Sequence, residues 1–151
     1  MALAIVHSRA CVGVEAPNVT VEVHISNGLP GFALVGLPET TVKEARDRVR
    51  SAIVTSNFEF PSRRITVNLA PADLPKEGGR FDLPIALGIL VASGQIPAKR
   101  LHEFEFLGEL ALSGQLRPVK GALPAALASQ KAQRALVVPD DNASQVALVD
   151  S

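Results

Sequence analysis

The residues best suited to bind a ligand lie in one glycine-containing run, KEGGR at 76–80. Asp82 follows closely and is expected to be the N-cap of a helix. A helix N-terminus offers partial positive charge and free N–H groups, and glycines let a ligand approach the backbone. This run therefore predicts an anion-binding site for phosphate, carboxylate or an acidic side chain, formed by Lys76, Gly78, Gly79 and Arg80. The alternative is a plain glycine turn in which Arg80 pairs with Asp82 or Glu77.

A second candidate is a set of four arginines. Two are one helical turn apart and would share a face, and two are adjacent further along the chain. Because guanidinium groups bind phosphates, the set is a candidate nucleic-acid surface: Arg46, Arg50, Arg63 and Arg64. Acidic residues nearby would neutralise much of its field, and the chain has no Trp or Tyr and only six Phe to stack on bases.

Several other chemistries lack a sequence signal. No G-x-x-x-x-G-K-[ST] phosphate loop occurs, so we expect no ATP site in this segment. The three histidines are far apart and the metal-ligand spacings are missing, so we also expect no metal or other cofactor. No G-x-S-x-G turn supports a hydrolase. A cryptic peptidase stays open as an alternative, with a serine and a lysine drawn from Ser62, Ser93, Ser113, Lys76 and Lys120.

The first third of the chain is expected to form strands. Period-2 valines, among them Val12 and Val14, predict two strands on either side of Pro17-Asn18, and a third is expected at 32–37. We expect these three to form an antiparallel meander. Further strands are expected at 64–69, 104–107, 111–112, 115–118 and 135–138.

Four helices are expected as well. The first spans 41–56 and is expected to begin with a capping box of Thr41 and Glu44. The second, 83–93, is apolar almost all round, so a charge at Leu87 should unfold the protein. The other two are expected at 123–133 and 143–149. Strands followed by helices and strands in alternation predict an α+β fold, a two-layer sandwich with helices on one face of a mixed sheet.

The composition is that of an ordinary globular protein. The chain has 151 residues, 47% hydrophobic and 20% charged, which suits a single domain over 1–151. Fifteen basic and fifteen acidic residues give zero net charge, which argues against a dedicated polyanion-binding domain. One cysteine, Cys11, indicates a reducing compartment. With no signal peptide and no membrane-length apolar run, we expect a cytoplasmic protein.

Three long motifs resemble a known family. VGLPETTVKEARDRVRSAI, NLAPADLPKEGGRFDLPIALGIL and FLGELALSGQLRPVKGALPAAL closely resemble the N-terminal domain of the ComM/YifB family of magnesium-chelatase-like proteins. The resemblance implies a hexameric AAA+ helicase-like motor that promotes branch migration of imported DNA. It places ATP and Mg in a module outside this segment, and the abrupt ending also suggests a fragment. Implied partners are further copies of the chain and DNA through the full assembly, with no membrane.

The same segments resemble the proteolytic domain of Lon. That resemblance implies a left-handed βαβ unit, shared with the ribosomal-protein and sugar-kinase-like superfold. Lon-type peptidases place a serine at the start of the buried helix and a lysine after the motif GELALSGQ. Here the stretch 76–82 has no serine, Leu123 stands at the lysine position, and Lys120 lies three residues earlier. We therefore expect a non-catalytic accessory domain.

Overall fold

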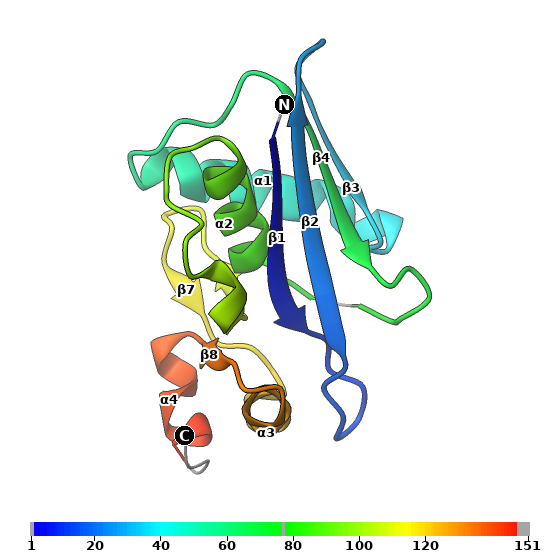
Figure 1. Cartoon of the computed structure of the whole chain (residues 1–151), viewed down its shortest axis with the longest axis vertical. Helices are drawn as coiled ribbons and strands as arrows, with labels where there is room; N and C mark the ends of the chain where they lie inside the picture. Colours follow the sequence, from blue (N-terminus) through cyan, green and yellow to red (C-terminus); the bar gives the residue numbers. More distant parts are fainter. Residues whose placement is uncertain (1, 77, 148–151) are drawn as a thin grey trace.

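A computed structural model of the chain describes residues 2–76 and 78–147. Its main feature is a mixed six-stranded sheet in the order β3-β4-β2-β1-β5-β8 (Figure 1). The strands of this sheet are β1 Ala2–Arg9, β2 Asn18–Ser26, β3 Gly31–Val35, β4 Arg64–Ala70, β5 Phe104–Phe106 and β8 Ala135–Val137. A separate hairpin joins β6 Glu109–Leu110 to β7 Leu116–Arg117. The helices are α1 Glu39–Thr55, α2 Asp82–Ala92, α3 Ala122–Lys131 and α4 Ala143–Val146, with 3-10 turns at Leu101–Glu103 and Asp140–Asn142.

The strand pairing corrects the expected meander. β2 lies antiparallel between β1 and β4, whereas β3 pairs with β4 in parallel and does not touch β2 as a neighbour. The reason is that α1 carries the chain from β3 across to β4, which is the connection that a parallel pair requires. The first strand is also earlier than expected. Val12 and Glu15 close a tight turn around Gly13, whose φ of +61° suits glycine.

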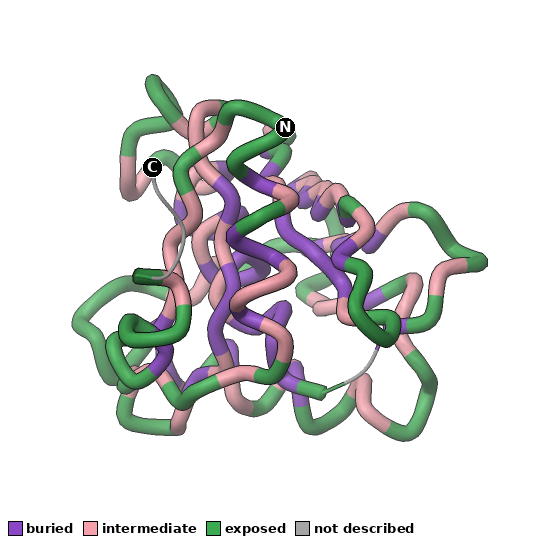
Figure 2. Tube along the Cα trace, turned by 90° about the horizontal axis from the view of Figure 1, so that it is seen from below, coloured by how far each residue is buried: buried purple, intermediate pink, exposed green. Residues whose placement is uncertain are grey.

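Helices α1 and α2 pack on the same face of the sheet, as Figure 1 shows. Alternate side chains of β2 and β4, such as Val23 and Val67, point into this core and are fully buried. Ile53 of α1 and Ile89 of α2 meet them there. Burial of this apolar surface is the main force that holds the layers together. The buried run along the strands is visible in Figure 2.

Helix α3 packs on the opposite face, so the expectation of helices on one face alone is wrong. Phe106 of β5 packs against the core under α1 and α2, while the next residue, Leu107, packs against Ala125 of α3. Because consecutive side chains on a strand point to opposite faces, the two cores lie on opposite sides of the sheet. Both β3–α1–β4 and β5–α3–β8 connect adjacent parallel strands, so the fold is α/β rather than the expected α+β.

The helix starts differ from the expected capping. Helix α1 begins two residues early, and the Thr41 hydroxyl donates to the Pro38 carbonyl at 2.8 Å instead of capping the helix. Asp82 is the first residue of α2 and makes no capping bond, because its carboxylate has other partners. The end of α1 agrees with expectation, since Asn57 adopts the left-handed conformation common after a helix, with φ of 69°.

Candidate functional site

The glycine-containing run predicted as an anion site lies just before α2, but its lysine points elsewhere. Lys76 is 4% exposed, and its ammonium donates to the carbonyls of Pro71 and Leu74 at 2.7 and 2.9 Å. Burial lowers the pKa of Lys76, with a weaker opposing effect of Asp73. Lys76 therefore holds the loop between β4 and α2 in place, because its ammonium group donates to backbone carbonyls and not to a ligand.

The side chain of Arg80 also makes structural hydrogen bonds. Its Nε donates to the Arg9 carbonyl at 3.0 Å and its Nη1 to the Lys120 carbonyl at 2.6 Å, and the residue is 5% exposed. Arg9 in turn forms a buried ion pair with Glu105, Nε to Oε1 at 2.7 Å. Arg80 thus ties β1 to the segment before α3. The alternative pairing with Asp82 is not made, and Glu77 lies outside the described residues.

Three of the four predicted anion-site residues share one cavity. Gly78, Gly79 and Arg80 line a hollow of about 350 Å³ together with Cys11, Glu109, Pro118, Val119 and Lys120. A Cβ at Gly79 would lie 2.5 Å from the Glu109 side chain, so any larger residue here would force that side chain to move. Glu109 and Lys120 line this cavity with opposite formal charges, and Nε and Nη1 of Arg80 donate to backbone carbonyls, so the structure does not favour an anion here. The anion site stays a prediction.

The carboxylate of Asp82 lies close to this loop, and its partner could not be predicted from the sequence. Arg48 Nε donates to Oδ2 at 2.6 Å, and the Leu110 backbone N–H donates to the same oxygen at 3.1 Å. Burial raises the pKa of Asp82 to about 6, against the lowering effect of Arg48 and Leu110. Arg48 also pairs with Glu44 of the same helix, at 3.7 Å on the surface.

The structure does not assemble the serine–lysine pair of the peptidase alternative. Across residues 2–76 and 78–147, no hydrogen bond joins Ser62, Ser93 or Ser113 to Lys76 or Lys120. The Ser93 hydroxyl donates to the Leu90 carbonyl at 3.2 Å and accepts from the Gln95 amide. A serine needs a nearby base to act as a nucleophile, so this geometry offers the alternative no support.

The four predicted nucleic-acid arginines gather around the start of β3. Arg50 and Arg63 line a groove of about 170 Å³ between β3 and the α1–β4 connection. Arg46 Nη1 donates to the Phe32 carbonyl at 3.0 Å, and Arg64 is the first residue of β4, opposite Gly31 of β3. The sequence separated these residues into two pairs, and the parallel pairing of β3 with β4 brings the pairs together.

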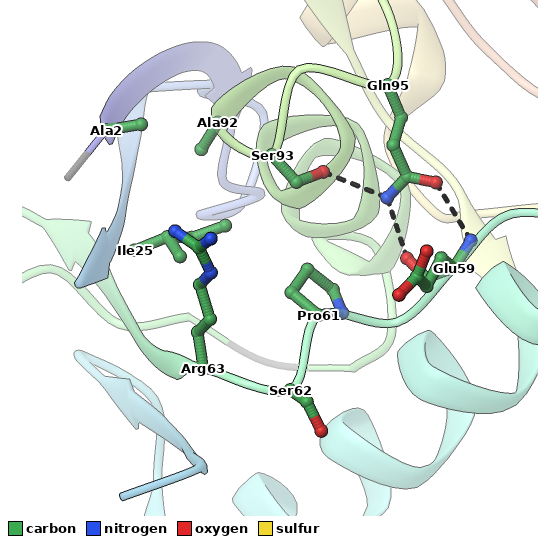
Figure 3. A pocket seen from close by; sticks show the side chains of 9 residues that line it. All are labelled: Ala2, Ile25, Glu59, Pro61, Ser62, Arg63, Ala92, Ser93 and Gln95. Carbon is green, nitrogen blue, oxygen red and sulfur yellow. Dashed lines mark hydrogen bonds between the residues drawn. The ribbon is translucent and has the colours of Figure 1, made fainter. Parts of the chain in front are cut away.

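A second cavity opens beside this groove, and Figure 3 shows the residues that line it. Its volume is about 350 Å³, and it shares Pro61, Ser62 and Arg63 with the groove. Arg63 reaches across the cavity toward Ile25, while Gln95 holds the backbone of Glu59 by two hydrogen bonds of 2.7 and 2.8 Å (Figure 3). The α1–β4 connection therefore separates the groove from the cavity, and the two hydrogen bonds of Gln95 hold it in place.

Over 2–76 and 78–147, no three His, Cys, Asp or Glu side chains lie close enough together to hold a metal ion. In that same part of the chain no helix combines the length and apolar character needed to cross a bilayer.

With this geometry in place, the chain can be compared with known proteins. A family model described as subunit ChlI of Mg-chelatase matches residues 21–142, which include both helices α1 and α2 and the glycine loop. The chain therefore belongs to this ChlI family.

Individual relatives fall into two groups. The chain is 66% identical over 149 residues to competence protein ComM of Haemophilus influenzae, which covers 99% of this chain and 29% of that protein. It is 61% identical over 150 residues to the uncharacterized protein YifB of Escherichia coli, covering 99% and 30%. A Lon protease of Mycoplasma mobile is 26% identical over 124 residues, covering 77% of this chain and 14% of the protease. The chain thus spans about three-tenths of the length of the ComM and YifB relatives.

Proposed function

We propose that the chain is a non-catalytic accessory and assembly domain of a hexameric AAA+ motor. The motor would use ATP and Mg²⁺, bound in a module outside these residues, to drive branch migration of DNA during natural transformation and recombination. The observation that carries the proposal is the 66% identity to competence protein ComM across 99% of the chain. Its partners are then further copies of the same protein and DNA, and its place is the cytoplasm.

The lack of catalysis is supported by what occupies the site of the Lon-type chemistry. We include in the proposal a Lon-type fold with its left-handed βαβ unit, for which the distant match to a Lon protease is the support. At the start of α2, Arg80 and Asp82 make structural contacts to β1 and α1. Leu123, at the position of the expected lysine, has no ionisable group. A scaffold that has replaced both partners of a nucleophile–base pair is suited to binding and assembly.

The proposal is tested by incubating the purified chain with ATP and Mg²⁺ and, separately, with an unfolded protein substrate. We expect hydrolysis of neither above the rate of a heat-denatured sample. Turnover of peptide bonds that is lost in a Lys120→Ala variant would contradict the proposal and restore the peptidase alternative. Turnover of ATP by the chain would contradict the placement of the ATP site in another module.

A further inference from the structure

We propose that the groove between β3 and the α1–β4 connection binds phosphodiester groups of single-stranded DNA through Arg50 and Arg63. The inference rests on the proposed function for its choice of DNA as the ligand, and on the groove for everything else. The groove holds about 170 Å³ and is lined by Pro30, Gly31, Phe32, Arg50, Phe60, Pro61, Ser62 and Arg63. This volume admits a small anionic group rather than a base with its sugar.

The electrostatics of the groove favour an anion. Of the described residues that line it, the charged ones are Arg50 and Arg63, and both are exposed. Neither has a carboxylate within 4.0 Å in the described part of the chain, in contrast to Arg9, Arg48 and Arg100. The Arg63 side chain extends toward Ile25 in the neighbouring cavity (Figure 3), while Arg50 lines the groove, so each guanidinium group can contact its own phosphate of a strand that crosses the α1–β4 connection.

The side chain of Arg50 is restrained by packing on an aromatic ring. Its guanidinium carbon lies 5.2 Å from the ring centroid of Phe60, and that ring packs against Phe32 with centroids 5.4 Å apart. A cation–π contact restrains the long side chain without neutralising its charge, so less entropy is lost when a phosphate binds. Because Arg50 covers one Phe60 face and Phe32 packs beside it, we expect phosphate recognition without base stacking, and therefore little sequence preference.

The other two arginines extend the positive surface along the same edge. Arg46 anchors to the Phe32 carbonyl, which fixes α1 against β3 at the base of the groove. The Arg64 guanidinium lies over Gly31, 3.6 Å from the place where a Cβ would be, so the glycine leaves the rim open. Glu59 lines the neighbouring cavity and ends the positive track on that side.

Phosphodiesters fit these features better than an acidic protein segment does. The planar guanidinium fork matches the two free oxygens of a phosphodiester, and the repeating strand supplies one such group per nucleotide along the edge. A protein segment with carboxylates would also contact the apolar residues of the groove, Pro30, Phe32, Phe60 and Pro61, but it lacks the regular charge spacing of a nucleic-acid strand. An acidic protein partner is therefore the competing outcome of the test.

The test is fluorescence anisotropy of a labelled oligothymidylate with the chain across a salt series. The variant is Arg50→Ala with Arg63→Ala. The matched control is Lys99→Ala with Arg100→Ala, because it removes the same charge and Arg100 is also exposed and also lies over a phenylalanine, 5.7 Å from the Phe104 ring. We expect the groove variant to bind about tenfold or more weakly at low salt, and its salt slope to fall by about 1.4, or about 0.7 per lost phosphate contact. The control should stay within about twofold of the wild type.

Three results would overturn the proposal. One is no binding by the wild-type chain at low salt. Another is an equal loss of binding in the control pair, which would show an effect of net charge alone. The third is stronger displacement of the oligothymidylate by polyglutamate than by unlabelled oligothymidylate, which would make the groove a protein contact. Thermal melts of all variants verify folding. Any of these failures leaves the proposed function standing, because that function is tested separately by the ATP and protein hydrolysis assays.

Discussion

Arg48 and Asp82 form a two-point ion pair between the first two helices: Nε donates to Oδ2 at 2.6 Å and Nη2 donates to Oδ1 at 3.2 Å. The backbone N–H of Leu110 donates to the same carboxylate. One side chain that is 2% exposed therefore joins α1, α2 and the β6–β7 hairpin.

Replacing Arg48 with Met should destabilise the protein strongly, because it leaves the buried Asp82 carboxylate without its cation. We expect a loss of about 3–5 kcal/mol in the free energy of unfolding, measured by urea denaturation. The control is Glu44→Gln, which removes only the exposed partner of Arg48 and should cost under about 1 kcal/mol. Equal losses in the two variants would show that the Asp82 contact is not the important one.

The raised pKa of Asp82 predicts a definite pH dependence. The folded chain holds this proton up to about pH 6, whereas the unfolded chain releases it near 3.8. The Asp82 contribution to stability is therefore fully present below 3.8 and is lost as the pH rises toward about 6. His7 acts in the opposite sense, because burial and then Arg134 lower its pKa below 6.5 and stability is lost as the pH falls.

Comparison with Asp82→Asn separates these two titrations, since both proteins keep His7. The stability of the wild type relative to the variant should fall as the pH rises through the Asp82 window, by at most about 1.4 kcal/mol per pH unit. Urea denaturation at several pH values measures this difference. A difference that stays constant, or that grows with rising pH, would contradict the assignment of a raised pKa to Asp82.

Gly88 in the middle of α2 provides a test of packing against helix propensity. Propensity alone predicts that Gly88→Ala stabilises an exposed helix by about 1 kcal/mol. Here, however, the new Cβ would lie 2.5 Å from Cγ2 of Val23 on β2, so we expect a loss of about 1–3 kcal/mol. Adding Val23→Ala should make room and reduce the loss caused by the alanine at 88. A gain in melting temperature for Gly88→Ala alone would contradict the close packing of α2 on the sheet.

Local patterns predicted the helices better than the contacts between them. The expected helix at 83–93 and strand at 64–69 lie within one residue of α2 and β4, because periodicity and breakers act over short stretches. Leu87 is partly exposed while Ile85 and Ile89 are fully buried, so the unfolding expected from a charge at Leu87 stays a prediction. Which side of a nearly uniform apolar helix faces the sheet is decided by its neighbours and leaves no mark on its own periodicity.

Contacts between distant residues were beyond such patterns. Arg48 and Asp82 are 34 positions apart, and the Arg9–Glu105 pair spans 96. Lys76 and Arg80 were expected to face a ligand, yet both donate to backbone carbonyls, a choice that depends on where the β4–α2 loop folds. The sequence predicts the four arginines as one candidate surface. The groove between them arises from the parallel pairing of β3 with β4, which the expected meander did not contain.

We propose that this chain serves as an accessory domain of a DNA motor. The decisive experiment is natural transformation of Haemophilus influenzae whose ComM carries this chain in place of its own matching region. We expect the chimera to restore transformation close to the wild-type frequency, while a chimera with Arg48→Met should not, because its domain is unstable. A stable, expressed chimera that leaves transformation at the level of a strain lacking ComM would rule out this role.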